Sequence, residues 1–249
     1  MSTPITEPPG ASVRHPPAPE GRTIYAVGDI HGRLDLLEKI QRRIDEDKKG
    51  LGATRVSEIY LGDYIDRGPD SAGVVSRLIA RGRSVEAIFL RGNHEQVLLN
   101  FLDGEPCLED WRAFGGIPTL LSYQLAPDLL GREVLAETVH AAFVRRLPAE
   151  HRQFYAATSS YCDAKPYLFV HAGIRPGVKL EEQSLVDLLT IRKGFLDYAG
   201  DLGRVVVHGH TPVMAPEMRP NRINVDTGAF ATNKLTCLKI DAAGPRLLT

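Results

Sequence analysis

The chain has 249 residues, a formal net charge of −1 and a hydrophobic fraction of 43%. This length suits one large α/β domain, and the near-zero charge argues against general binding to nucleic acids or membrane surfaces, which requires a basic excess. Three scattered cysteines, Cys107, Cys162 and Cys237, form no CxxC pair. They indicate a reducing compartment rather than a disulfide-bonded scaffold.

The N-terminal stretch, residues 1–21, is rich in proline and has few side chains that could pack. It lacks the apolar segment of a signal peptide, and we predict a disordered tail there. No stretch of the chain approaches the ~18 consecutive apolar residues of a transmembrane helix. We therefore expect a cytoplasmic protein with one catalytic domain over residues 22–249.

From residue 22 the pattern alternates between strands and helices. Residues 22–27 predict a strand, and residues 33–49 predict an amphipathic helix with apolar side chains at helical spacing. Two further strands are predicted over residues 56–63 and 84–91, with a helix between them and another helix from about His94. This order predicts a layered α/β fold whose first sheet begins with parallel strands.

The middle of the chain, residues 101–165, has a mainly helical pattern. Strand patterns return in YLFVHAG, RVVVHGH, INVDTGA and KLTCLKID. Because no long helices separate the last three, we expect them to be antiparallel strands of a second sheet. The predicted architecture is an α/β fold with a two-sheet β-sandwich flanked by helices.

Polar clusters follow five of the predicted strands, in the motifs GDIHG, GDYIDRG, RGNHE, HAG and HGH. Each motif alone is more often a turn, but strand ends in α/β folds form the ligand-binding edge, so five such motifs predict a shared site. Their carboxylate, amide and imidazole groups suit manganese, iron or zinc, and six ligands suit two metal ions bridged by a carboxylate. The candidate ligands are Asp29, His31, Asp63, Asn93, His171 and His210.

In this order, over about residues 23–240, the five motifs resemble the signature of the PPP family of metallophosphoesterases, which includes the serine/threonine phosphatases of the phage lambda and calcineurin type. The resemblance implies a metallophosphoesterase-type sandwich and two divalent metal ions, manganese foremost, with iron or zinc as alternatives. The first three candidate ligands would hold one ion and the last three the other, with Asp63 as the bridge.

The resemblance also implies hydrolysis by direct attack of a hydroxide that bridges the two metal ions, without a covalent phosphoenzyme. His94 would be the general acid, oriented by Asp66, and Arg67 would bind the substrate phosphate. IRKGF is similar to an Ile-Arg-x-x-Phe stretch of bacterial members, which implies a second phosphate ligand, Arg192. Thr190 stands where tryptophan is common, and an arginine on a helix surface is the alternative.

Two further residues have open roles. Trp111, in WRAFGGIPTLLSY, either packs in the core, which we favour, or forms a wall over the cleft with Gly115 and Gly116. His208 either supports the metal ligands or packs at the end of its strand.

The expected activity is hydrolysis of phosphoserine or phosphothreonine, with a phosphoprotein or phosphopeptide as the partner. The alternative is a symmetrical dinucleoside-polyphosphate hydrolase of the same fold, whose members typically have alanine in place of Asp66 and aspartate in place of Glu95. The DRG and GNHE motifs favour the phosphatase, as does the absence of an aromatic cluster next to the five motifs. A phosphate-binding module without catalysis is disfavoured, because His94 and every ligand are present.

Overall fold

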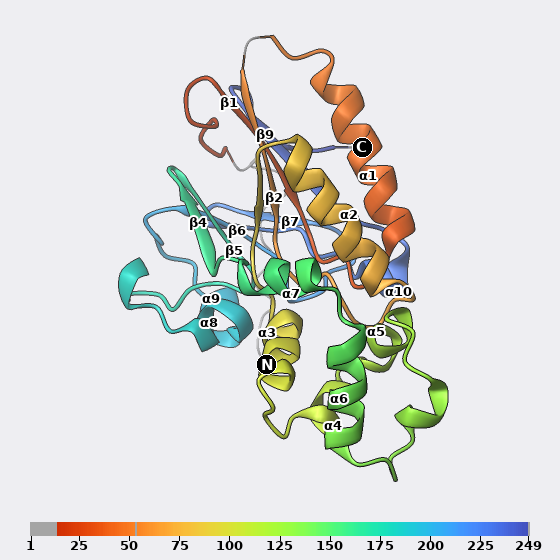
Figure 1. The fold of residues 1–249 in the computed structure, drawn as a ribbon. Coiled ribbons are helices and arrows are strands. Elements are labelled where there is room, and N and C mark those ends of the chain that lie inside the picture. Colours follow the sequence, from red (N-terminus) through yellow and green to blue (C-terminus); the bar gives the residue numbers. More distant parts are fainter. Residues whose placement is uncertain (1–13, 53, 249) are drawn as a thin grey trace.

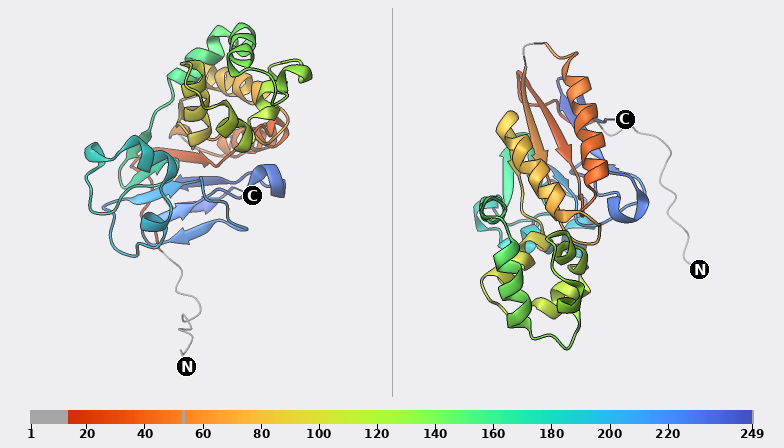
Figure 2. Two further views of the ribbon diagram at one scale, coloured as in Figure 1. Left: turned by 90° about the horizontal axis from the view of Figure 1, so that it is seen from below. Right: turned by 45° about the vertical axis from the view of Figure 1, so that its right-hand side comes forward.

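The protein, as a computed structural model that describes residues 14–52 and 54–248, consists of two mixed sheets packed face to face with helices outside them (Figures 1 and 2). The first sheet contains, in spatial order, β10 (Gly244–Leu247), β9 (Cys237–Asp241), β1 (Arg22–Val27), β2 (Arg55–Tyr60) and β3 (Ala87–Phe89). The second contains β4 (Tyr161–Ala164), β5 (Tyr167–Val170), β6 (Val205–His208), β8 (Arg222–Asn224) and β7 (Glu217–Arg219). The predicted two-sheet α/β architecture is confirmed.

Helices fill most of the connections between these strands. They are α1 (Leu34–Lys48), α2 (Ser71–Ser84), α3 (Asn93–Leu102), α4 (Leu108–Ala113), α5 (Ile117–Ser122), α6 (Ala136–Arg146), α7 (Ala149–Ala156), α8 (Leu185–Thr190), α9 (Lys193–Leu196) and α10 (Ala229–Thr232), with 3-10 turns η1 (Pro127–Leu130) and η2 (Leu180–Glu182). The segment from α3 to α7 gathers beyond the carboxyl ends of β1 and β2 (Figure 1). No helix among the described residues is long and apolar enough to cross a membrane.

The predicted arrangement of the late strands is wrong in two respects. β6 pairs with β8 in parallel, because the chain first makes β7 and then turns back into β8, which is antiparallel to β7. β9 leaves the second sheet and pairs antiparallel with β1, in a register that places Ile240 beside Ile24. Both isoleucines are buried in the same cluster between the sheets, so apolar packing accounts for the crossing of β9 to the first sheet.

The alternation of side chains along β1 shows that the first sheet is buried on both of its faces. Ile24 and Ala26 point into the cluster between the sheets, whereas Tyr25 and Val27 point into the cluster that contains the apolar faces of α1 and α2. These two helices lie side by side on the outer face of the first sheet (Figures 1 and 2). Because helices cover the outer faces of the sheets, a ligand reaches the sheets at the polar strand ends, where we expect the functional site.

A buried carboxylate joins the first sheet to the two helices that cover it. Glu58, in β2, accepts hydrogen bonds from the Arg81 guanidinium (2.6 and 2.9 Å) and the Tyr60 hydroxyl (2.7 Å), and it pairs with Lys48. Burial would raise the pKa of Glu58, but the hydrogen bonds from these three groups outweigh it and hold the pKa below its ordinary value. The ionised form is therefore the one that stabilises the fold.

Replacing Glu58 by glutamine is expected to lower the free energy of unfolding by about 3 kcal/mol at pH 7, because it removes one partner of a buried ion pair. The contribution of ionised Glu58 is complete above the unfolded-state pKa of about 4.3 and is lost as the pH falls through the lower folded-state pKa. Urea unfolding in the presence of a chelator, at pH 7 and at pH 3, measures the free energy of unfolding of the wild type and of Glu58→Gln. The difference between the two proteins should be smaller at pH 3 than at pH 7. The exposed Glu46→Gln variant is the control, and a difference independent of pH would contradict this role.

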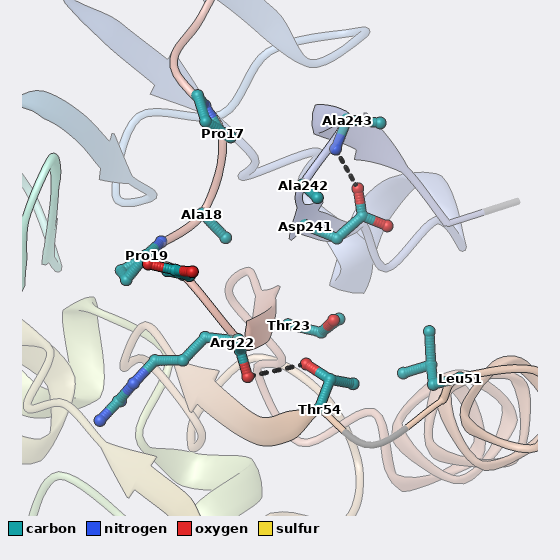
Figure 3. A pocket seen from close by; sticks show the side chains of 12 residues that line it. Pro17, Ala18, Pro19, Arg22, Thr23, Leu51, Thr54, Asp241, Ala242 and Ala243 are labelled. Carbon is teal, nitrogen blue, oxygen red and sulfur yellow. Dashed lines mark hydrogen bonds between the residues drawn. The ribbon is translucent and has the colours of Figure 1, made fainter.

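The structure differs from the predicted disordered tail at residues 14–21; residues 1–13 lie outside the described part of the chain. The Ala18 amide donates to the Asp241 carbonyl (2.9 Å), and the Tyr167 hydroxyl donates to the Pro16 carbonyl. A cavity of about 740 Å³ lies between this segment and the turn after β9 (Figure 3). No residue of the five polar motifs lines it, and its lining combines prolines and alanines with Glu20, Arg22 and Asp241.

Candidate active site

The carboxylate of Asp63 is the centre around which the strand-end motifs converge. Its Oδ1 lies 3.4 Å from Nε2 of His171, and its Oδ2 lies 3.6 Å from Nε2 of His31 and 3.8 Å from Nε2 of His94. Two groups of potential metal ligands therefore share Asp63: one with His31 and His94, the other with His171 and His210. One carboxylate with an oxygen toward each group has the geometry of a bridge between two cations.

Asn93 and Asp29 complete the arrangement. The Asn93 Oδ1 atom lies 3.1 Å from Nε2 of His171 and 2.9 Å from Nδ1 of His210. The Asp29 Oδ2 atom accepts the His210 amide hydrogen (3.0 Å), while its buried Oδ1 has no hydrogen-bond partner among the described residues. An unpaired buried carboxylate oxygen is costly without a cation. All six predicted ligands thus come together, and their mix of donors fits divalent transition metals.

Backbone carbonyls orient two of the candidate ligands. Nδ1 of His31 lies 2.8 Å from the Ile65 carbonyl, and Nδ1 of His171 lies 2.9 Å from the Leu61 carbonyl. Because a carbonyl can only accept, we place the ring hydrogen on Nδ1 in both histidines. Each Nε2 then directs a lone pair toward Asp63, as metal-binding histidines do.

The backbone of the site is strained. Among the residues that the structure describes, seven non-glycine residues have a positive φ angle, and five are candidate site residues: His31, Asp63, Asp66, Arg67 and His210, with φ from 46° to 71°. This region costs a non-glycine residue roughly 1–3 kcal/mol, and such strain persists where the surroundings fix it and clusters at functional sites. A Cβ atom on the neighbouring Gly92 would collide with the Asp63 carboxylate, which explains a glycine there.

Glu95 is a supporting residue to which the sequence analysis assigned no role. Its carboxylate accepts hydrogen bonds from the amides of Asp63 (2.8 Å), Tyr64 (2.8 Å) and Gly92 (2.9 Å). It thereby joins the start of α3 to the loop that holds Asp63. Burial and the nearby Asp63 charge raise the pKa of Glu95 to about 7. Its position in GNHE, directly after His94, was the feature of the sequence that could have identified it as a site residue.

Asp226 is a second acidic residue of the site that sequence reasoning missed. It is buried just after β8, and burial and the Asp63 charge raise its pKa. Its Oδ1 accepts the Gly228 amide hydrogen (2.9 Å), and its charge contributes to the raised pKa of the buried Asp29 carboxyl. The rule that polar residues follow strands applies equally to INVDTG and would have identified it.

The predicted pair of His94 and Asp66 is in contact. Nδ1 of His94 lies 2.6 Å from Asp66 Oδ2. Burial would lower the pKa of His94, but the charges of Asp63 and Asp66 outweigh it and raise the pKa. A protonated His94 has the hydrogen that a general acid needs. Because its Nε2 also faces Asp63, His94 has the position of a metal ligand as well, so its role as acid stays a prediction.

Two other side chains also hold the Asp66 carboxylate. The Trp111 Nε1 atom donates to Asp66 Oδ2 (3.0 Å), and the Thr119 hydroxyl donates to Asp66 Oδ1 (2.6 Å). Trp111 is fully buried and packs against Phe101 and Phe143. The favoured interpretation of Trp111 as a core residue is confirmed, and this residue also fixes the group that orients His94.

A cavity of about 360 Å³ opens onto these groups. It is lined by Asp63, Arg67, Asn93, His94, Phe114, Thr190, Arg192, His210 and Pro212. Arg67 and Arg192 thus share one cavity, although Arg192 lies between α8 and α9 rather than within a helix, with its Nη2 atom 3.4 Å from the His210 carbonyl. One guanidinium group can donate two parallel hydrogen bonds to two phosphate oxygens, so a cavity with two arginines suits a phosphorylated ligand.

The positions of three ring side chains, those of Phe114, Phe230 and His208, could not be predicted from the sequence and are given by the structure. Phe114 lines the cavity, and Phe230 lies with its ring edge-on to His31. The five motifs have no aromatic cluster next to them in the sequence, but folding brings these two aromatic residues to the site from other parts of the chain. His208 instead packs its ring on Phe195, 5.0 Å between centroids, and burial lowers its pKa to about 3, which favours strand-end packing.

The chain is similar to several proteins that are named as bis(5'-nucleosyl)-tetraphosphatases, of which two are described. One is the asymmetrical bis(5'-nucleosyl)-tetraphosphatase PrpE of Oceanobacillus iheyensis, 27% identical over 87% of this chain and 88% of that protein. The other is the symmetrical bis(5'-nucleosyl)-tetraphosphatase of Acidovorax sp. (strain JS42), 33% identical over 83% of this chain and 64% of that protein.

A solved structure and a family model extend these comparisons. The crystal structure of a proposed diadenosine tetraphosphatase has a TM-score of 0.62 at 18% identity, covering 90% of this chain and 92% of that one, which shows a shared fold. A family model described as calcineurin-like phosphoesterase matches residues 22–214, most of the chain. The chain therefore belongs to the calcineurin-like phosphoesterase family and is a metal-dependent phosphohydrolase.

Proposed function

We propose that the protein hydrolyses dinucleoside tetraphosphates, with manganese as the metal. The observation that carries this proposal is the similarity, over nearly the full length of both chains, to a bis(5'-nucleosyl)-tetraphosphatase. It replaces the phosphoserine and phosphothreonine phosphatase that the motifs alone favoured. Phe114, exposed by 49% at the cavity, adds support because an aromatic face there can stack on a nucleobase.

In this reaction the site residues would have three roles: binding metal ions, binding phosphate and donating a proton. When bound, two metal ions would lower the pKa of a water molecule and neutralise phosphate charge. Asp63 would bind both ions, and the other five candidate ligands would bind one each. Arg67 and Arg192 would hold the polyphosphate by paired hydrogen bonds, and His94 would donate a proton to the leaving oxygen.

A phosphoprotein phosphatase is the second candidate, and the hydrogen bond between His94 and Asp66 favours it. A serine or threonine alkoxide is a poor leaving group and benefits strongly from a positioned acid. A polyphosphate leaving group is stabilised by its own charge distribution and needs less help. The support of Asp66 by Trp111 and Thr119 is therefore more valuable to a phosphatase.

A comparison of substrates separates the two candidates. We expect kcat/KM with manganese to be higher for diadenosine tetraphosphate than for a phosphoserine peptide, with both activities lost on chelation. Chromatography of the products distinguishes cleavage to ATP and AMP from cleavage to two ADP. Higher kcat/KM on the peptide would contradict the proposal and support the phosphatase.

The variant Phe114→Ala tests the contribution of the aromatic face. It should lower kcat/KM for diadenosine tetraphosphate about tenfold, since stacking of a base on an aromatic side chain is worth ~1–3 kcal/mol. The same variant should change the activity on a phosphoserine peptide much less. Leu121→Ala is the control, because Leu121 is an exposed apolar residue of α5 outside the cavity.

A further inference from the structure

We infer that Phe230 is a positioning residue for substrate phosphate, because its ring supports the guanidinium of Arg67. The Arg67 Cζ atom lies over the Phe230 ring, 4.8 Å from the centroid. Phe230 is not among the residues that line the catalytic cavity, so it acts through Arg67. The inference rests on the proposed phosphohydrolase function, in which Arg67 binds phosphate.

Arg67 has little other support for its charged end. In the described part of the chain, no carboxylate lies within ion-pair distance of its guanidinium, whose side-chain contact is His31 Nε2, 3.3 Å from Nη1. The Arg67 amide donates to the Gly115 carbonyl (2.9 Å), which fixes the backbone but does not by itself orient the long side chain. A carboxylate partner would fix the guanidinium but would also compete with phosphate for its hydrogens.

An aromatic face supports a guanidinium without this competition. The ring attracts the cation through its electron-rich face, while the N–H groups at the edge of the guanidinium stay available. Two N–H groups of that edge can then bind two phosphate oxygens in parallel. Phe230 therefore limits the orientations of Arg67 and keeps its positive charge uncompensated for the substrate.

The helix that carries Phe230 is itself held in place. Arg33 Nη1 donates to the Ala229 carbonyl (3.0 Å) and to Asn233 Oδ1 (2.6 Å), at the two ends of α10. Arg33 belongs to the loop after β1, which also holds His31, and it is anchored by an ion pair with Asp35 (2.6 Å). The ring of Phe230 is thus fixed relative to the loop that carries a candidate metal ligand.

Substitutions that separate aromatic character from apolar bulk test the inference. Phe230→Leu keeps an apolar side chain but loses the ring, whereas Phe230→Tyr keeps the ring face. We expect Phe230→Leu to weaken binding of inorganic phosphate to the manganese-loaded protein about three- to tenfold by calorimetry. It should raise KM for p-nitrophenyl phosphate by a similar factor, with kcat changed less than about twofold, because it alters binding more than the chemical step. Phe230→Tyr should restore most of the binding.

A double-mutant comparison shows whether Phe230 acts through Arg67. In the Arg67→Ala background, Phe230→Leu should have no further effect on phosphate binding. Three outcomes would overturn the inference. Phe230→Leu could bind phosphate as tightly as the wild type, Phe230→Tyr could lose as much phosphate binding as Phe230→Leu, or the losses of the two single variants could add in the double variant. If Arg67→Ala alone leaves phosphate binding unchanged, the phosphate role of Arg67 fails and the inference fails with it.

The test is independent of which substrate the protein prefers. If the protein prefers phosphopeptides, the proposed dinucleotide activity fails, but the phosphate-binding measurements still decide the role of Phe230. Thermal denaturation of each variant shows whether a loss reflects local unfolding. We expect unchanged midpoints, because the Phe230 side chain is substantially exposed.

Discussion

Asp63→Asn is expected to lower kcat by about 10³-fold or more and to remove metal from both halves of the site. Metal ions supply several kcal/mol of transition-state stabilisation, so loss of both has an effect of this size. Asp63 is the residue on which the two ligand groups meet, with Oδ1 toward His171 and Oδ2 toward His31. An amide has one oxygen and no charge, so it cannot serve both groups.

Elemental analysis after loading with manganese measures this effect directly. The wild-type protein should hold about two ions per chain. Asp29→Asn is the matched comparison, because Asp29 is expected to bind one ion, so that variant should lose chiefly one. Retention of both ions and of activity in Asp63→Asn would refute the bridged site. Thermal unfolding in chelator separates metal loss from loss of the fold.

His94→Asn is expected to lower kcat by about 10²–10⁴-fold on substrates with poor leaving groups, the usual contribution of acid–base catalysis. The loss should be smaller on p-nitrophenyl phosphate, whose leaving group needs less protonation. A phosphoserine peptide and p-nitrophenyl phosphate, assayed under the same manganese conditions, provide the comparison. Asp66→Asn should show a weaker form of the same defect, because Asp66 orients the ring and transfers no proton itself.

Equal losses on both substrates would show that His94 has another task. Its Nε2 lies 3.8 Å from Asp63 Oδ2, in a group of potential metal ligands with His31. If His94 is a ligand, His94→Asn should also reduce the manganese content. The metal analysis and the leaving-group dependence therefore decide between the two roles.

The convergence of the candidate metal ligands could be predicted from the sequence because most of them stand just after a strand. Asp29, Asp63 and His171 are fixed in position within a few residues of a buried strand, so local pattern suffices to place them. Parallel pairing brings the ends of β1 and β2 together in the first sheet and the ends of β5 and β6 together in the second. The packing of the two sheets then places Asp63 next to His171. Asp226 could have been predicted in the same way, because it stands just after the end of β8.

Other features depend on long-range packing and had no local signal. Phe114 reaches the cavity through the turn between α4 and α5, and Phe230 reaches Arg67 through the placement of α10. The course of β9 was equally hidden, because its apolar side chains suit either sheet and only packing against β1 decides between them. The motifs favoured the phosphatase because they contain Asp66 and Glu95, whereas Phe114, which supports the proposed dinucleotide substrate, had no comparable signal in the sequence.

The pairing of β1 with β9 has a consequence for synthesis of the protein. Ile24 emerges early from the ribosome, but its neighbour Ile240 is translated more than 200 residues later. Until then one edge of β1 is an open template for other strands, and contacts of such long sequence separation form slowly. The nascent chain carries most of its catalytic side chains well before the sheet that positions them is complete. We therefore expect activity, and release from chaperones, to appear only after β9 has been made.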